Sequence, residues 1–405
     1  MLHEKLLKTI QKYNLIQKQD KIVIGVSGGP DSMCLLDSLY CLKEKLDIEI
    51  VVAHVNHMIR KEAEEETAYV KSYCEEHTIP CFIKKVEVIA LAKEQKLGTE
   101  EMGRKIRYDF FIEVAKKTGA NKIATAHNAN DNAETVFMNI IRGSGIPGLK
   151  GIEIKRSITT HSLIAQKDAE FLQNKKNIEK LKFDEDYKRI ANAKGKKENK
   201  TLEIIRPLRE CTRNEIEEYC KIKNLNPKID SSNLENDYTR NKIRNIVIPY
   251  LQKEFNPNIL EGLNRLSDLA LEEEEYFSEI VKKEYENLQI EEIEKIKRTE
   301  QTKIIKEKKT ENKVECKKIE KNNNQKTMIL DLKKFNLLPK VIRSKLLLYT
   351  IYQTTGNVQG ISKIHIEDVI KLCQNNIGNK YLTPNKKIKI FVRKGKIYFI
   401  SQEIG

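Results

Sequence analysis

Residues 21–42, KIVIGVSGGPDSMCLLDSLYCL, join a short β-branched run to a helix pattern through a turn of glycines and serines. The run at 21–26 predicts a buried strand, and the apolar spacing at 30–42 predicts a helix. Gly28 and Gly29 allow the backbone of the turn to adopt positive φ and to approach an anion closely. The stretch therefore predicts a strand, an anion-binding turn and a helix, in that order.

The alternation of strand and helix patterns continues to about residue 142. Further strands are predicted at 48–54, 81–88 and 122–126, and further helices at 62–77, 99–118 and 131–142. Short strands separated by helices of twelve or more residues indicate βαβ units and a parallel sheet. We therefore expect an α/β fold with a parallel doubly wound sheet, followed by a helical region and a small α+β C-terminal domain.

Changes in composition divide the chain into three expected parts. Residues 1–215 form the N-terminal domain and include a Lys-rich insertion at about 153–203. Residues 216–326 form a helical region that ends in another Lys-rich stretch. Residues 327–405 are richer in apolar residues than the Lys-rich stretch before them. They end in KIKIFVRKGKIYFIS, which predicts a hairpin.

Composition excludes several classes of protein. The chain has 405 residues, 39% of them hydrophobic, which excludes a wholly disordered chain, a collagen and a disulfide scaffold. No apolar stretch approaches the roughly 18 residues of a spanning helix, and the N-terminus lacks the pattern of a signal peptide. Eight cysteines without a CxxC fit a reducing compartment, so we expect a cytoplasmic protein.

The net charge of +15 has two interpretations that composition alone leaves open. A Lys-rich proteome would give this balance without any functional meaning. A polyanionic partner would also select it, since Lys and Arg neutralise phosphates and release counterions.

The turn SGGPDS at 27–32 has the chemistry of a phosphate site. Pro30 suits a first helical turn, where its missing N–H costs nothing, and the helix start attracts anions. Ser27 and Ser32 add hydroxyl donors. Asp31 would repel a bare phosphate, so we expect Mg²⁺ held between Asp31 and phosphate oxygens.

SGGPDS between a strand and a helix resembles the signature of the PP-loop, or N-type, ATP pyrophosphatases. Further motifs narrow the resemblance. They are HVNHMIR at 54–60, GRKIRYDFF at 103–111, the stretch beginning TAHNANDNAET at 125–152, RPL at 206–208, DSSN at 230–233 and TRNKIRN at 239–245. Over about residues 15–250, the chain is similar to the tRNA(Ile)-lysidine synthetases.

This resemblance implies a reaction and its partners. Family members use ATP to adenylate the C2 oxygen of the wobble cytidine in the CAU anticodon of tRNA(Ile). The amine of L-lysine then displaces AMP, so the products are lysidine, AMP and pyrophosphate. By resemblance, the Lys-rich second half holds the tRNA, and a homodimer stays an open alternative.

The resemblance also assigns roles to residues. The expected ATP-binding residues are Ser27, Gly28, Gly29, Pro30, Asp31, Ser32, Ala53 and Met102, with Asp31 also holding Mg²⁺. The expected catalytic residues are Asp31, Arg104, Arg107, His127 and Asp131. The expected tRNA-binding residues are Arg240 and Arg244, although surface ion pairs would explain their i, i+4 spacing too.

Three asparagines depart from the commonest family pattern. Asn128, Asn130 and Asn132 stand where His, Asp and Gln are frequent. Because Asn130 removes a carboxylate, Asp131 carries more of the expected role in orienting the lysine amine.

Other functions remain as alternatives at this stage. A PP-loop tRNA 2-thiolation enzyme would need a cysteine pair or an iron–sulfur cluster near the site, and the chain has no CxxC. A PP-loop ligase of small molecules would not need a basic second half. A non-catalytic RNA-binding protein would not be expected to keep SGGPDS intact. Pyrophosphate release that depends on tRNA separates these classes.

Overall fold

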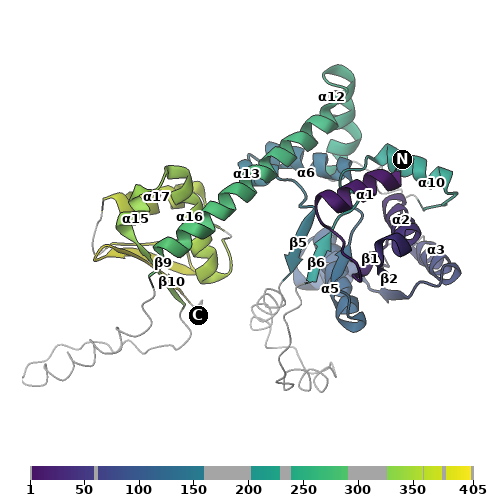
Figure 1. Cartoon of the computed structure of the whole chain (residues 1–405), viewed down its shortest axis with the longest axis horizontal. Helices are drawn as coiled ribbons and strands as arrows, with labels where there is room; N and C mark the ends of the chain where they lie inside the picture. The colour runs from purple at the N-terminus through teal and green to yellow at the C-terminus, as the bar shows by residue number, and fades with distance from the viewer. Residues whose placement is uncertain are drawn as a thin grey trace, which may run out of the picture. The chain divides into compact units, whose positions relative to one another are not determined.

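The computed structural model describes residues 2–58, 63–158, 202–228, 239–290, 326–358, 360–375 and 380–402. The chain divides into two compact units, Met1–Leu271 and Glu272–Gly405 (Figure 1). Within the described part, no helix is both long and apolar enough to cross a bilayer. The motif DSSN at 230–233 and most of the predicted insertion at 153–203 lie outside the described residues. The division into three functional parts stays a prediction.

The first unit is built on a six-stranded sheet of order β3-β2-β1-β4-β6-β5. Its strands are β1 (Lys21–Gly25), β2 (Glu49–Asn56), β3 (Cys81–Lys85), β4 (Lys122–Ala124), β5 (Lys155–Ile158) and β6 (Leu202–Ile205). Every neighbouring pair is parallel except β5 and β6. The predicted α/β fold with a parallel sheet is confirmed.

Helices cover both faces of this sheet because its central strand is apolar on both sides. Ile22 and Ile24 of β1 face a core shared with α1 (Leu2–Lys12), α2 (Pro30–Leu46), α3 (Ala63–Glu76) and α10 (Arg213–Ile222). Val23 faces the opposite core, which includes Phe110 and Phe111 of α5 (Thr99–Thr118). The alternation of side chains along one strand thus explains the two helical layers.

Two local predictions need correction. The strand predicted at 81–88 ends at Lys85, and Val88 instead begins α4 (Val88–Gln95). Val88 is buried there with Ala92 and Met102, so helical packing takes this end of the apolar run. Strands β5 and β6 were not predicted; β5 and the first residues of β6 fall within the segment interpreted as an insertion.

Further helices of the chain lie between β4 and β5 or after β6. They are α6 (Ala129–Ile141), α7 (Ile146–Leu149), α12 (Ile248–Glu254) and α13 (Ile259–Leu288), and α11 (Thr239–Lys242) runs into a π-helical turn, η2 (Ile243–Val247). Leu263 of α13 packs against Ala133 and Val136 of α6. This contact fixes the start of α13 within the first unit.

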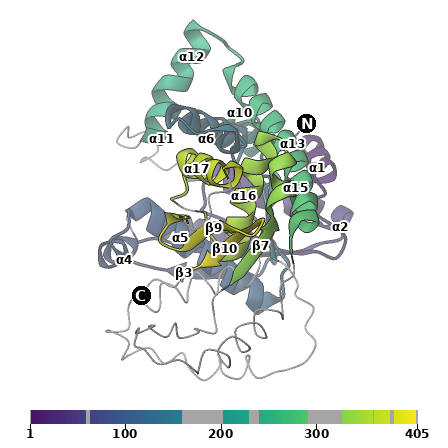
Figure 2. The ribbon, with the colours of Figure 1, turned by 90° about the vertical axis from the view of Figure 1, so that its left-hand side faces the viewer.

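The second unit is an antiparallel sheet covered by helices. Its strands β7 (Thr327–Asp331), β8 (Tyr381–Asn385), β9 (Ile388–Arg393) and β10 (Lys396–Ser401) have the order β7-β10-β9-β8. Helices α15 (Leu332–Leu337), α16 (Lys340–Thr355) and α17 (Lys363–Gln374) lie against these strands (Figure 2). The predicted hairpin is confirmed, because β9 pairs with β10 across Lys394 and Gly395, which both have positive φ.

Candidate active site

The two strongest motifs meet where the order of strands reverses. The SGGPDS turn follows β1, and the segment 125–131 follows β4, which is the parallel neighbour of β1. Connections from β1 and β4 leave in opposite directions along the sheet, which leaves a crevice at their carboxyl ends. A hydrogen bond of 2.9 Å from Asn128 Nδ2 to Asp31 Oδ1 joins the two segments.

The hydroxyl of Ser32 orders the SGGPDS turn. Ser32 Oγ accepts hydrogen bonds from the backbone N–H groups of Ser27 and Gly28, at 3.1 and 3.2 Å. It donates to the carbonyl of Gly29 at 3.0 Å. Gly28 has φ of +93°, which explains why glycine stands there, and Pro30 begins α2. The turn therefore gathers N–H groups at a helix start before any ligand arrives.

Asp31 lies in the first turn of α2 and is largely buried. Burial and, to a smaller extent, the negative charge of Asp131 together raise the pKa of its carboxyl to about 6. The hydrogen bond from Asn128 and the charges of Arg213 and Arg244 oppose this shift. An ionised carboxylate in such a setting gains from a nearby cation.

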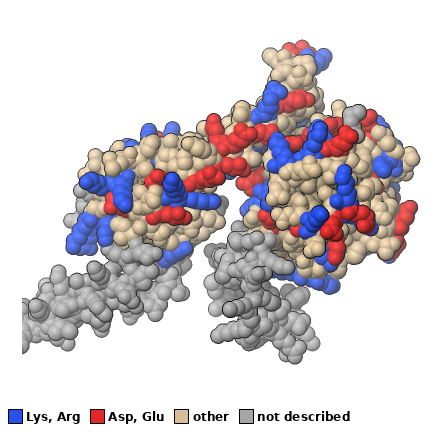
Figure 3. Space-filling view, in the orientation of Figure 1, with Lys and Arg blue, Asp and Glu red and all other residues tan. Residues whose placement is uncertain are grey.

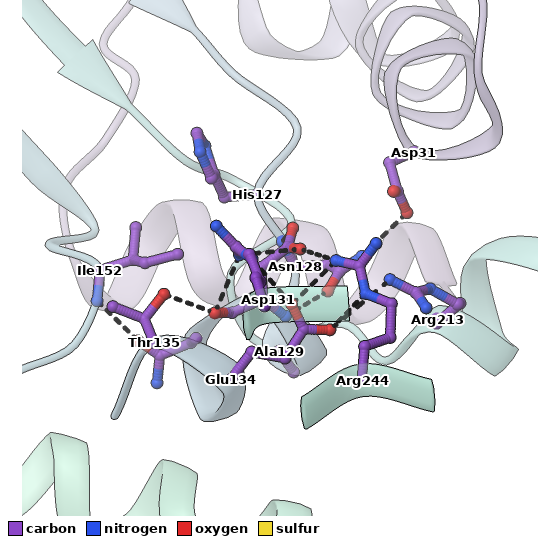
Figure 4. Close-up of polar contacts among 12 residues, drawn as sticks. Asp31, His127, Asn128, Ala129, Asp131, Glu134, Thr135, Ile152, Arg213 and Arg244 are labelled. Atoms are coloured by element: carbon purple, nitrogen blue, oxygen red, sulfur yellow. Dashed lines mark hydrogen bonds and ion pairs between the residues drawn. The ribbon is translucent and has the colours of Figure 1, made fainter. Parts of the chain in front are cut away.

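The three asparagines form hydrogen bonds at the first turn of α6, and Figure 4 shows Asn128 beside Asp131 there. Asn128 caps the helix: its side chain accepts from the N–H of Asp131 at 2.9 Å, and Asp131 Oδ2 accepts from the N–H of Asn128 at 3.2 Å. Asn130 Oδ1 accepts from the N–H of Arg213 at 3.0 Å. Asn132 Oδ1 accepts from the N–H of Ile152 at 2.7 Å. The departures from the family pattern thus have structural roles.

A cluster of carboxylates and guanidinium groups surrounds this turn. Arg244 Nε donates to Glu134 Oε1 at 2.6 Å, and Arg240 Nε donates to Glu134 Oε2 at 2.9 Å. Arg244 Nη2 also reaches Asp131 Oδ1 at 3.0 Å. Only 2% of the Glu134 side chain is exposed, so this carboxylate depends on its cationic partners.

The ion pairs change the interpretation of two predicted residues. Burial alone would lower the pKa of Arg244, but its hydrogen bond to Glu134 and the negative charges around it raise that pKa. Arg240 and Arg244 therefore face carboxylates of α6, and contact with tRNA stays a prediction for both. Glu134 was not predicted as a site residue. Its i, i+3 spacing to Asp131 was visible in the sequence, but its burial was not.

A second group is rich in arginine. Arg104 and Arg107 of α5 are exposed, whereas Arg206, which follows β6, is buried. In the described part of the chain, none of these three arginines forms an ion pair with a carboxylate. Burial, together with the charges of Arg206 and Arg104, lowers the pKa of His127 to about 3, so its imidazole is neutral at pH 7. This group offers positive charge to an anion.

The two remaining predicted residues, Ala53 and Met102, are buried, as is His54 of the HVNHMIR motif. Ala53 lies in β2, where its carbonyl accepts from the N–H of Val26 at 3.1 Å. Met102 packs with Val88 and Ala92. His54 Nδ1 contacts the carbonyl of Val26, and its Nε2 contacts the hydroxyl of Thr67, both at 2.9 Å. His54 therefore supports the ends of β1 and β2 with both ring nitrogens, while contact of Ala53 and Met102 with adenine stays a prediction.

Comparison with known proteins agrees with this geometry. The PP-loop domain family matches residues 2–251. A tRNA(Ile)-lysidine synthase of Clostridioides difficile is 36% identical over 406 residues, covering 100% of this chain and 71% of that protein. One of Clostridium acetobutylicum is 35% identical over 94% of this chain and 66% of its own length. One of Caldanaerobacter subterraneus is 42% identical over 67% of this chain and 49% of its own length.

The chain thus spans between about half and seven tenths of the length of these relatives. Among solved structures, the U34-tRNA thiolase NcsA of Methanococcus maripaludis aligns with a TM-score of 0.45 and 18% identity, over 66% of this chain and 78% of that chain. That similarity is too low to inform the activity. The match to the PP-loop domain and the identities above show that the chain belongs to the tRNA(Ile)-lysidine synthases, a family of ATP-dependent ligases.

Proposed function

We propose that this chain joins L-lysine to the wobble cytidine of the CAU anticodon of tRNA(Ile), using ATP. The observation that carries the proposal is the bond between Asn128 and Asp31, which brings the anion-binding turn to the carboxylates of α6. One segment has the chemistry to bind a triphosphate, and the other has the chemistry to bind an ammonium group. Family membership supplies the substrates that fit these two halves.

In this proposal, the SGGPDS turn binds the phosphates of ATP. The N–H groups of Ser27 and Gly28 are gathered on one hydroxyl, and the start of α2 adds its dipole. Asp31 fits a role in holding Mg²⁺, because one of its oxygens, Oδ1, is fixed by Asn128 and an ionised carboxylate that is largely buried gains from a nearby cation. A Mg²⁺ ion held by Asp31 would supply positive charge to the phosphates of ATP.

In this proposal, the side chains around the crevice have different roles in the reaction. Arg104 and Arg107 offer charge to the adenylate or to the tRNA backbone, because no carboxylate in the described residues pairs with them. Neutral His127 hydrogen-bonds the hydroxyl of Thr125 at 3.1 Å and is available to orient a substrate oxygen. Asp131 accepts a hydrogen bond from the ammonium of lysine and assists the removal of its proton, so that the neutral amine attacks the activated C2 and AMP leaves. Catalysis is then mainly positioning together with neutralisation of charge.

The C-terminal part of the second unit, residues 327–405, is suited to hold tRNA. It contains 14 Lys and Arg against 4 Asp and Glu. In Figure 3, the visible face of the second unit carries many basic side chains, with acidic ones among them. Affinity for tRNA should then fall steeply as salt rises, because bound phosphates release counterions. We place the reaction in the cytoplasm, where ATP and tRNA occur together. A homodimer stays an alternative to a monomer, and sedimentation of the protein would distinguish the two.

The deciding experiment measures incorporation of labelled lysine into purified tRNA with ATP and Mg²⁺. We expect labelling of isoleucine tRNA with a CAU anticodon and none of methionine tRNA with the same anticodon. Absence of label from both, with folded protein that binds ATP, would refute the proposal. Sulfur donors and ammonia would then replace lysine in the same assay. Pyrophosphate release that does not depend on tRNA would indicate a ligase of small molecules.

A further inference from the structure

Helix α13 is attached to the first turn of α6 through one asparagine. Asn264 Nδ2 donates to the carbonyl of Ala129 at 3.1 Å and to that of Leu260 at 2.9 Å. Its Oδ1 accepts from Asn132 Nδ2 at 2.8 Å. Asn132 is fully buried, and its own Oδ1 accepts from the N–H of Ile152. Asn264 therefore uses both ends of its amide to join α13 to α6.

A second set of polar contacts joins the next turn of α13 to Arg209, which follows β6, and to Lys150, which follows α7. Arg209 Nη2 donates to Ser267 Oγ at 2.9 Å and to Asp268 Oδ1 at 3.0 Å. Ser267 Oγ donates to the carbonyl of Lys150 at 2.7 Å. Arg209 and Ser267 are buried. Residues Asn132, Asn264, Ser267, Asp268 and Arg209 form what we call the α13 latch.

The latch determines where α13 lies on α6. The apolar contacts of Leu263 with Ala133 and Val136 stabilise the helix pair, but apolar surfaces tolerate small shifts. Buried hydrogen bonds are directional, so a shift along the helix would leave buried amides without partners. The turn at Gly151 is shaped around the amide of Asn132, since a Cβ at Gly151 would lie 2.2 Å from Asn132 Oδ1.

The latch acts on the part of α6 that carries the proposed chemistry. Ala129 and Asn132 flank Asp131 in the first turn, and the cap of that turn, Asn128, is bonded to Asp31. A change in the position of α13 therefore moves Asp131 relative to Asp31. Misplacement of a reacting group by about 1 Å is enough to lower a rate by about 100-fold.

We propose that Asn264 is a positioning residue for the lysine-transfer step. It holds the first turn of α6 so that Asp131 stays in line with the nucleotide bound at Asp31. This inference rests on the proposed function, because the step that it affects is the transfer of lysine. It predicts a loss in turnover and little change in the binding of ATP, since Asn264 makes no contact with the SGGPDS turn in the described structure.

The test uses Asn264→Leu, which keeps a similar volume and removes both hydrogen-bonding ends. Glu261→Gln is the matched control, because Glu261 is exposed on the preceding turn of α13. We expect kcat for lysine transfer to fall by about 10- to 100-fold in Asn264→Leu, with KM for ATP within about twofold of wild type. Glu261→Gln should match wild type in both constants.

Two outcomes overturn the inference. The first is a folded Asn264→Leu protein with wild-type kcat. The second is a variant whose loss is entirely a rise in KM for ATP. If Asn264→Leu does not fold, Asn264→Asp decides, because it keeps the acceptor for Asn132 and removes the donor to Ala129 and Leu260. That variant should lower kcat by at least threefold, and an unchanged kcat refutes the proposal. Failure of the wild-type protein to transfer lysine would instead refute the proposed function.

Discussion

Replacement of Asp31 by asparagine should stabilise the fold while it abolishes activity. The pKa of Asp31 rises from 3.8 to about 6, mainly through burial. Each pKa unit corresponds to about 1.36 kcal/mol, so the ionised carboxylate destabilises the ligand-free fold by about 2–3 kcal/mol at pH 7 or above. Asparagine has the same shape, and its oxygen still accepts the hydrogen bond from Asn128, so it removes the charge alone.

The extra stability of Asp31→Asn over wild type should increase as the pH rises. The folded protein holds the Asp31 proton more tightly than the unfolded chain, so the contribution of Asp31 to stability falls as pH rises from about 4 to about 6. The difference between Asp31→Asn and wild type should therefore be small at pH 4. It should grow to its full size by about pH 6.5.

The assay is urea unfolding of both proteins between pH 4 and pH 8, without ATP or Mg²⁺. Glu44→Gln on the same helix is the control, because the Glu44 side chain is 91% exposed and should show no such trend. Lysine transfer is measured in parallel, and Asp31→Asn should have lost it. A variant that is equally stable or less stable than wild type at pH 8 would refute the reasoning about burial.

Three further substitutions test other parts of the site. Glu134→Gln should lower the free energy of unfolding by about 1–3 kcal/mol, since Arg240 and Arg244 lose a buried carboxylate and keep only Asp131 as an ionic partner, and an unchanged free energy in denaturant unfolding would contradict this. Gly151→Ala should lower Tm more than Gly119→Ala: both glycines have positive φ, but only the first would place a Cβ against another side chain. Between pH 7 and pH 5, the free energy of unfolding of His127→Gln should fall by about 2 kcal/mol less than that of wild type, because the unfolded chain protonates His127 below about pH 6.5 and the folded protein does not. An equal fall for both proteins in urea unfolding would contradict the lowered pKa of His127.

Local patterns were enough to predict most of the sheet. Strand β1, the SGGPDS turn and α2 are encoded within 26 consecutive residues, and the same alternation gives β2 and β4. Strand β6 has only four residues, LEII, and follows a Lys-rich stretch, so its pairing with β4 depends on tertiary contacts. Periodicity carries no information of that kind.

The site was predictable in its parts but not in its connections. The sequence places Asp31 and Asp131 after two parallel strands, which is why their proximity could be expected. It does not show that Arg240 and Arg244 are paired with α6, because those partners lie more than 100 residues away. The structural use of Asn132 was hidden for the same reason, since its partner Asn264 lies 132 residues further on.

The hydroxyl of Ser32 has a consequence for the kinetics and heat of nucleotide binding. It already occupies the N–H groups of Ser27 and Gly28, so an incoming phosphate exchanges one set of hydrogen bonds for another. The turn does not need to order itself when the ligand arrives, and association is not slowed by a folding step. Calorimetry of the phosphate contacts should show a small change in heat capacity, because little apolar surface is buried in such an exchange.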